Sequence, residues 1–183
     1  CQVIGEGANL GVTQRGRIEA GERGVRLNTD AIDNSAGVNT SDVEVNIKIA
    51  LSPLLRGGVL SLSDRDTLLG EMTGEVGQLV LRNNYLQTLA ISLTQRRGLD
   101  DLGFQQRLMQ ALERRDLLDR QVEFLPNDMD LAERRRRGQP LTRPELAVLL
   151  SHAKLALQDA IEASAMLGDP LLEPILMDAF PPA

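Results

Sequence analysis

The first thirty residues alternate between short apolar stretches and polar or glycine-rich turns. Gln2–Gly5 and Val25–Thr29 have the pattern of short buried strands that run into turn residues. Between them, Gln14–Glu22 has a helical pattern, with Thr13 placed to cap its start and Gly24 placed to end it. This order predicts a βαβ unit with a right-handed crossover between parallel strands. Two short strands do not make a stable parallel sheet, so we expect further strands outside this chain.

From Thr40 onward, apolar residues recur every three or four positions, which is typical of helices that bury one face. The first of these helices is predicted to end at Gly57-Gly58, and its apolar positions are Val43, Ile47, Leu51 and Leu54. Four further helices are predicted over residues 64–72, 73–96, 104–115 and 128–137. A fifth is predicted to begin at a capping box formed by Thr142 and Glu145 and to end at residue 164. A last helix is predicted from Asp169-Pro170 to before Pro181.

The composition changes near Gly57–Ser63, where glycine-rich sequence gives way to sequence rich in leucine and arginine. We place a domain boundary there, between an α/β remnant over residues 1–57 and a mainly helical domain over residues 58–183. The fold is therefore expected to be helix-rich overall. Because the chain opens inside a strand pattern, with Cys1 in place of an initiator methionine, we interpret it as a fragment truncated at both ends.

Composition narrows the class of protein. The 183 residues carry a formal net charge of -6 and 2% aromatic residues, and an aliphatic core suits packed helices better than a β-sandwich. Cys1 and His152 are the single cysteine and the single histidine, so this chain alone builds neither a disulfide framework nor a His/Cys metal site. A reducing, cytoplasmic location is expected. No apolar run approaches the ~20 residues of a membrane span, so no membrane partner is expected.

Two polar clusters are candidates for ligand binding. Residues 5–11 have the glycines of a phosphate-binding turn, but their spacing is GxGxxxG instead of GxGxxG, and spacing alone favours an ordinary strand-to-helix turn. Residues 30–42 lie after a strand and before a helix, where open α/β folds place their ligands. Asparagine amides there suit a carboxamide, and serine hydroxyls suit a carboxylate. The alternative, favoured by the pattern alone, is that Thr40, Ser41 and Asp42 only cap the helix.

Four consecutive arginines at residues 134–137 raise the question of nucleic-acid binding. The acidic net charge, the scarcity of aromatic residues and the neighbouring Asp130 and Glu133 favour a solvated helix end instead. No nucleic-acid partner is therefore expected. His152 has no second candidate ligand beside it, and no metal site is expected.

Several segments resemble one enzyme family. EGAN at Glu6–Asn9, followed by NSAGVNTS at Asn34–Ser41, is similar to paired segments of glutamate dehydrogenases in general. TQRGRIE, NTDAIDNSAGV and SDVEVNIKI, with LTRPELAVLLSHAK at Leu141–Lys154, resemble the large bacterial NAD-specific subtype in particular. This resemblance implies that residues 1–57 are the C-terminal part of a Rossmann-like dinucleotide-binding domain.

The same resemblance implies roles for four residues. Asn9 would lie against the nicotinamide ribose of NAD, and Asn34 would lie near both the nicotinamide and the substrate. Val38 and Ser41 would lie beside the substrate side chain, with Ser41 donating to its distal carboxylate. After Ser41 this chain has DVEV where the small-subunit enzymes have YFEW.

The activity implied by the resemblance is that of an oxidoreductase of amino-acid catabolism. The parent protein would oxidatively deaminate L-glutamate to 2-oxoglutarate and ammonia, with hydride transfer to NAD. This chain holds no predicted catalytic residue, because the cofactor fingerprint and the catalytic lysine are expected upstream, so the fragment alone is expected to be inactive. The parent is expected to be a homo-oligomer. The alternative for the helical part is an oligomerisation or regulatory interaction module.

Overall fold

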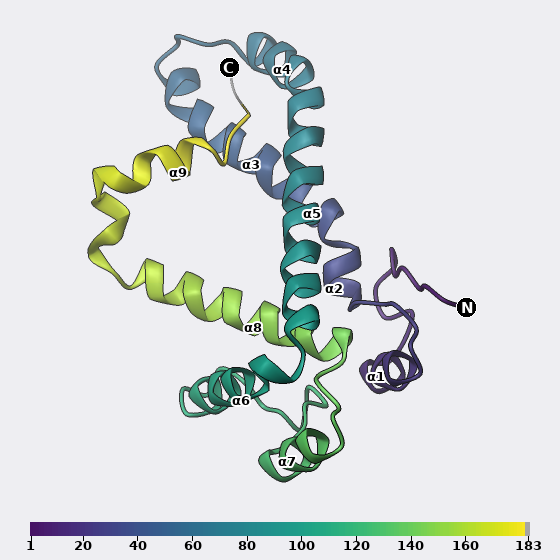
Figure 1. Ribbon diagram of the computed structural model, residues 1–183. Coiled ribbons are helices and arrows are strands. Elements are labelled where there is room, and N and C mark those ends of the chain that lie inside the picture. The colour runs from purple at the N-terminus through teal and green to yellow at the C-terminus, as the bar shows by residue number, and fades with distance from the viewer. Residues whose placement is uncertain (182–183) are drawn as a thin grey trace. The chain divides into compact units, whose positions relative to one another are not determined.

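A computed structural model describes residues 1–181, except for the side chain of residue 167, and this part of the chain is mostly helical (Figure 1). The α-helices are α1 (Gln14–Glu22), α2 (Asp30–Asp33), α3 (Ser35–Arg56), α4 (Leu62–Glu71), α5 (Thr73–Arg97), α6 (Leu99–Glu113), α7 (Asp128–Arg136), α8 (Arg143–Glu162) and α9 (Glu173–Met177). Two short 3-10 helices, η1 (Ala165–Gly168) and η2 (Pro170–Leu172), lie between α8 and α9. The prediction of a helix-rich fold is confirmed.

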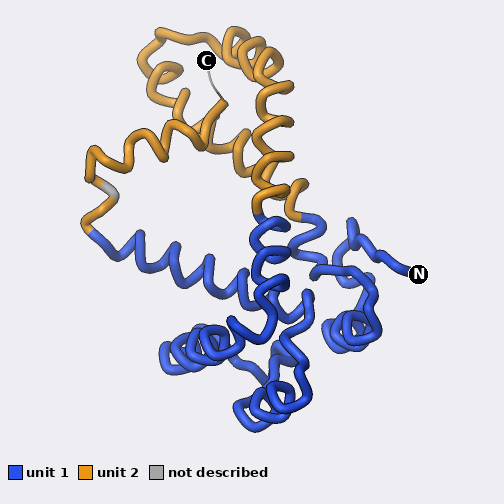
Figure 2. The backbone as a smooth tube through the Cα atoms, viewed as in Figure 1, with its two compact units in different colours: residues 1–34, 87–164 blue, residues 35–86, 165–183 orange. Residues whose placement is uncertain are grey.

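The chain forms two compact units, coloured separately in Figure 2. The first contains residues 1–34 and 87–164, and the second contains residues 35–86 and the segment that begins at Ala165. The predicted domain boundary between residues 57 and 58 falls inside the second unit. The predicted boundary separates a dinucleotide-binding domain from a helical domain, which is a different division from that into compact units. It therefore stays a prediction.

Of the predicted βαβ unit, the structure contains the helix and one parallel bridge between the two flanking segments. Helix α1 has the predicted bounds, because the Thr13 side chain accepts a hydrogen bond from the Gly16 N–H at 3.1 Å and Gly24 follows the helix with a φ of +84°. Val3 and Arg26 form an isolated parallel bridge, in which the Arg26 N–H donates to the Gln2 carbonyl at 2.9 Å.

The two predicted strands are therefore wrong as strands, since the described residues hold no β element beyond this bridge. The physical reason is that a parallel pair is stable only inside a wider sheet, and the described chain supplies no neighbouring strand. The Rossmann-like origin of this region stays a prediction.

The core of the first unit is built from aliphatic side chains on α6 and α8, with additions from α5 and α7. Leu102, Met109 and Leu112 of α6 are almost wholly buried, and their spacing places them on one helix face. The core residues are Ile32, Ile91, Leu102, Met109, Leu112, Leu118, Leu125, Leu131, Leu141, Leu146, Ala147, Val148 and Leu149. This confirms an aliphatic helical core.

The start of α8 confirms the predicted capping box. The Thr142 N–H donates to Glu145 Oε2 at 2.7 Å, as a capping box requires. Glu145 is fully buried, and Arg134 of α7 balances its charge through a 2.9 Å hydrogen bond to the same oxygen. One carboxylate therefore begins α8 and joins it to α7.

The second unit has a smaller core. Val43 and Ile47 of α3 and Val80 of α5 are its buried residues. Ser61 caps α4 through a capping box with Asp64. After α8, the single helix expected from Asp169 is wrong in detail, because η2 and the short α9 occupy this segment.

Candidate functional site

Glu6 fixes the loop that carries the EGAN motif. Its carboxylate forms a two-pronged ion pair with Arg17 of α1, with 2.5 Å between Nε and Oε2 and 2.9 Å between Nη2 and Oε1. The Val12 N–H also donates to Oε1 at 2.8 Å. Both charged side chains are buried, with 6% of Arg17 and 3% of Glu6 exposed. The hydrogen bond from Arg17 outweighs burial and holds the pKa of Glu6 below its ordinary value.

Asp30 and Asp33 of α2 hold the same loop from its other side. The Leu10 N–H donates to Asp30 Oδ2 at 2.9 Å, and the Glu6 N–H donates to Asp33 Oδ2 at 3.0 Å. Asp30 Oδ1 also lies 3.2 Å from Nη2 of Arg17. The Leu10 N–H is the largest cause of a lowered pKa at Asp30. Three carboxylates therefore fasten the loop to α1 and α2.

This anchoring places Asn9 beside Asn34. The Asn34 side-chain amide donates from Nδ2 to Asn9 Oδ1 across 3.0 Å. Asn9 is exposed and Asn34 is half-buried, so the pair lies at the surface of the first unit. The bond uses one polar group of each side chain. It leaves the amino group of Asn9 as a donor and the carbonyl oxygen of Asn34 as an acceptor.

Val38 and Ser41 lie on α3 in the second unit, three positions apart and therefore on the same helix face. Both side chains are exposed, Val38 to 60%. The structure thus brings Asn9 and Asn34 together in one unit and Val38 and Ser41 together in the other.

Two expectations about residues 30–42 are corrected. The segment is not a loop, because α2 and α3 cover most of it. The capping alternative for Thr40, Ser41 and Asp42 is also wrong, because α3 begins at Ser35 and Thr40 lies inside it, with its hydroxyl donating to the Ala36 carbonyl at 2.8 Å. The tertiary reason is that Ser35 is held by a hydrogen bond to Asn84 of α5.

A further chain of polar contacts reaches this loop from α8, and sequence reasoning missed it. Arg143 Nε donates to Asn28 Oδ1 at 2.6 Å, and Asn28 Nδ2 donates to Asp33 Oδ1 at 2.6 Å. Burial lowers the pKa of Arg143. No local pattern could pair residues 28 and 143, because the contact depends on the tertiary fold.

The remaining candidates from the sequence are the arginine run and His152. The four arginines end α7, as expected, and Arg137 pairs with Glu133 at 2.6 Å. His152 Nδ1 lies 2.8 Å from the Leu117 carbonyl oxygen. No group of three or more His, Cys, Asp or Glu side chains within the described residues is placed to hold a metal ion. Among the described helices, none combines the length and the apolar character needed to cross a membrane.

Comparison with known families defines the class of protein. A family model described as bacterial NAD-glutamate dehydrogenase, catalytic domain, matches residues 1–94, and a second, described as glutamate dehydrogenase, C-terminal, matches residues 138–183. The chain belongs to the bacterial NAD-glutamate dehydrogenase family. The resemblance carried by the EGAN and NSAGVNTS segments is confirmed.

Individual relatives agree with this assignment. The chain is 46% identical to the NAD-specific glutamate dehydrogenase of Halomonas elongata and 49% identical to that of Pseudomonas aeruginosa, each over 99% of its length. It is 40% identical over its whole length to the NAD-specific glutamate dehydrogenase of Mycobacterium tuberculosis. It spans 11% of the length of each of these relatives.

Proposed function

We propose that this chain is part of an NAD-dependent glutamate dehydrogenase that converts L-glutamate to 2-oxoglutarate and ammonia. Family membership and 40% to 49% identity to NAD-specific glutamate dehydrogenases support this proposal. NAD, when bound, supplies the chemistry by accepting a hydride from the substrate. A cytoplasmic location accompanies the proposal and stays a prediction.

The observation that carries the proposal is the hydrogen bond between Asn9 and Asn34. Their two remaining polar groups, one donor and one acceptor, match what a carboxamide such as that of nicotinamide accepts and donates. The buried Glu6–Arg17 ion pair fixes the loop before the ligand arrives, so little ordering is needed on binding. In this proposal, Asn9 and Asn34 orient the nicotinamide end of the cofactor.

Val38 and Ser41 are proposed to contact glutamate. The Ser41 hydroxyl can donate to the distal carboxylate, and the Val38 side chain can pack against the methylene groups. Asn34 is shared between cofactor and substrate. These four residues position the reactants, and effective positioning lowers the entropic part of the barrier.

The proton transfers are assigned to residues outside this chain. A lysine that exchanges protons near neutral pH has to be desolvated. Lys48 is instead exposed to 41% and pairs with Glu44 at 2.5 Å, while Lys154 donates to Gln87 at 2.7 Å on the surface. Neither lysine has the burial that the role requires.

Three variants of the full protein test this assignment. Asn34→Ala is expected to raise the KM for NAD about threefold to tenfold, the effect of losing one hydrogen bond. Ser41→Ala is expected to raise the KM for glutamate by a similar factor and to leave the KM for NAD unchanged. Asn46→Ala, at an exposed position of α3, serves as the control and should change neither constant. Unchanged constants in the first two variants would refute these contacts.

A second function, an interaction module that holds copies of the parent protein together, is supported by the C-terminal helices. Leu171, Ile175, Leu176 and Met177 are between 61% and 81% exposed. Apolar side chains exposed together in this way are typical of protein contact surfaces. Ile175→Ser with Leu176→Ser should reduce the assembly mass of the full protein in analytical ultracentrifugation and leave both KM values unchanged. An unaltered mass would argue against this module.

A further inference from the structure

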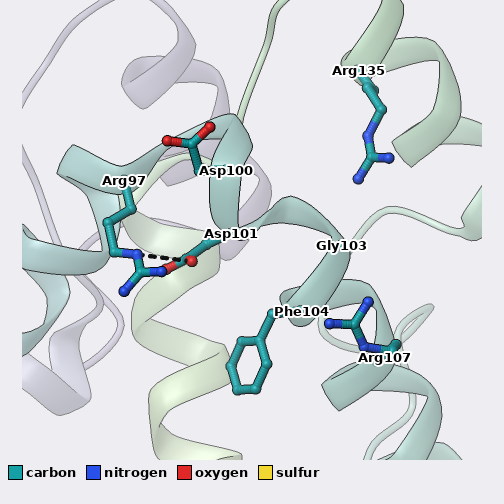
Figure 3. Close-up of a pocket in the computed structure, with 7 residues that line it drawn as sticks. All are labelled: Arg97, Asp100, Asp101, Gly103, Phe104, Arg107 and Arg135. Atoms are coloured by element: carbon teal, nitrogen blue, oxygen red, sulfur yellow. Dashed lines mark ion pairs between the residues drawn. The ribbon is translucent and has the colours of Figure 1, made fainter.

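Gly103 lies in the interior of α6, where glycine is less stable than alanine by about 1 kcal/mol. The space that glycine leaves is filled by two guanidinium groups. A Cβ atom at residue 103 would stand 3.2 Å from Nη2 of Arg135 and 3.6 Å from Nη1 of Arg107. Figure 3 shows these two arginines approaching Gly103, one from α6 itself and one from α7. A side chain at residue 103 would disturb this convergence.

The two arginines are both exposed, and both line the same hollow. Neither Arg107 nor Arg135 has a hydrogen-bonding or ion-pairing partner among the described residues. Two carboxylates line the same hollow: Asp101 pairs with Arg97 at 2.9 Å, and Asp100 is exposed. Like charges that converge repel each other, and an anion between them would turn that repulsion into attraction. Two guanidinium groups that face the same point therefore favour an anion between them.

The surroundings extend this site into a hollow of about 520 Å³. Phe104, with 58% of its surface exposed, lies along one side, and Asp100 lies with the Arg97–Asp101 pair on the side away from Arg135 (Figure 3). We call this place, lined by both free arginines, Gly103 and Phe104, the arginine hollow. Its lining combines two guanidinium groups with an exposed aromatic ring.

We propose that the arginine hollow binds a phosphate group, held jointly by Arg107 and Arg135. One guanidinium fork saturates a planar carboxylate, whereas a phosphate offers further oxygens to a second guanidinium that arrives from another helix. The aromatic ring of Phe104 gives an organic phosphate a surface to stack on. Such a site lies apart from Asn9 and Asn34 in the sequence and is independent of the proposed dehydrogenase function.

The test is calorimetric titration of the full protein with inorganic phosphate and, separately, with adenosine diphosphate, at constant ionic strength and with NAD present in saturating amount. Arg107→Gln and Arg135→Gln should each weaken binding about tenfold or more, because each removes charged hydrogen bonds. Arg114→Gln is the matched control, since it removes an exposed arginine at the end of the same helix but outside the arginine hollow. It should leave the affinity unchanged.

Gly103→Ala separates binding from folding. The substitution favours the helix and should keep or raise the melting temperature, yet it should weaken phosphate binding because the new methyl group displaces Arg135. Tighter binding of adenosine diphosphate than of phosphate, lost in Phe104→Ala, would identify an organic phosphate as the ligand. Equal affinities would identify free phosphate. Absence of binding, or an equal loss in Arg114→Gln, would overturn the proposal.

Discussion

At the scale of single residues, Glu6 joins the loop of the candidate site to α1 and α2. Its carboxylate accepts hydrogen bonds from Arg17 and from the Val12 N–H, and its own N–H donates to Asp33. Sequence analysis named Asn9 and Asn34 as candidates through the family resemblance, and their role stays a prediction. It missed Arg17, because a charged residue inside a short amphipathic helix gives no sign that its partner lies buried eleven positions earlier.

Breaking this ion pair should destabilise the first unit. Arg17→Met leaves the Glu6 carboxylate buried without its counter-charge, and such losses cost about 3–5 kcal/mol. The measurement is urea unfolding of the purified chain. Arg23→Met, directly after the same helix, is the control, because the pair of Arg23 with Glu19 is exposed and should contribute less than about 1 kcal/mol. Equal losses of unfolding free energy in the two variants would show that the buried pair stabilises the unit no more than the exposed pair does.

Acid should loosen the same loop. The pKa values of Glu6 and Asp30 are lowered in the folded state from ordinary values of 4.5 and 3.8. A lowered pKa means that the stabilisation is complete above the ordinary value and is lost as the pH falls through the lowered one. The melting temperature should therefore fall as the pH is taken from about 5 to about 2.

Glu6→Gln should flatten this acid dependence, because the amide does not titrate. Glu19→Gln, which removes an exposed carboxylate from α1, should leave the dependence as it is in the unaltered chain. If the melting temperature of Glu6→Gln falls with pH as it does in the unaltered chain, the acid sensitivity belongs to other carboxylates.

At the scale of secondary-structure elements, local signals predicted several boundaries, but the helices expected over residues 64–72 and 104–115 begin earlier, at Leu62 after the Ser61 cap and at Leu99 after Gly98. The bounds of α1 were predicted because Thr13 and Gly24 act locally, and the end of α5 was predicted because Gly98 follows it with a φ of +54°. The start of α3 was not predicted correctly, because NSAGVNTS has a loop-like composition, whereas the tertiary contact of Ser35 with Asn84 favours the helix. The bridge between Val3 and Arg26 likewise depends on partners outside the local sequence.

Helix α4 offers a test of a local signal. Ser61→Ala removes the cap at the Asp64 N–H, and losing such a cap costs about 1 kcal/mol. Because α4 has no buried residue, the loss should appear as faster hydrogen exchange of its amides, by about fivefold. Ser63→Ala, at an exposed position of the same helix, should not accelerate exchange. Equal exchange in both variants would argue that packing alone holds α4.

At the scale of the whole molecule, our proposal gives the described chain positioning groups and assigns the acid and base of the reaction to other parts of the parent protein. It spans 11% of the length of its relatives, so the proposed chemistry depends on residues elsewhere in the parent protein. Helix content and the aliphatic core followed from the hydrophobic pattern. The family followed from short polar motifs, most of which lie on α1, α3 and α8, since packing patterns of leucine and alanine are shared by unrelated helical proteins.

The most direct test of this account is NADH formation from NAD and L-glutamate, measured for the full protein, its Asn34→Ala variant and the isolated 183-residue chain. We predict activity of the full protein with NAD and L-glutamate in preference to NADP, L-leucine or L-phenylalanine. The variant should have a reduced kcat/KM for NAD, and the isolated chain should be inactive. No activity of the full protein with any of these pairs, or glutamate-dependent NADH formation by the isolated chain, would contradict the account.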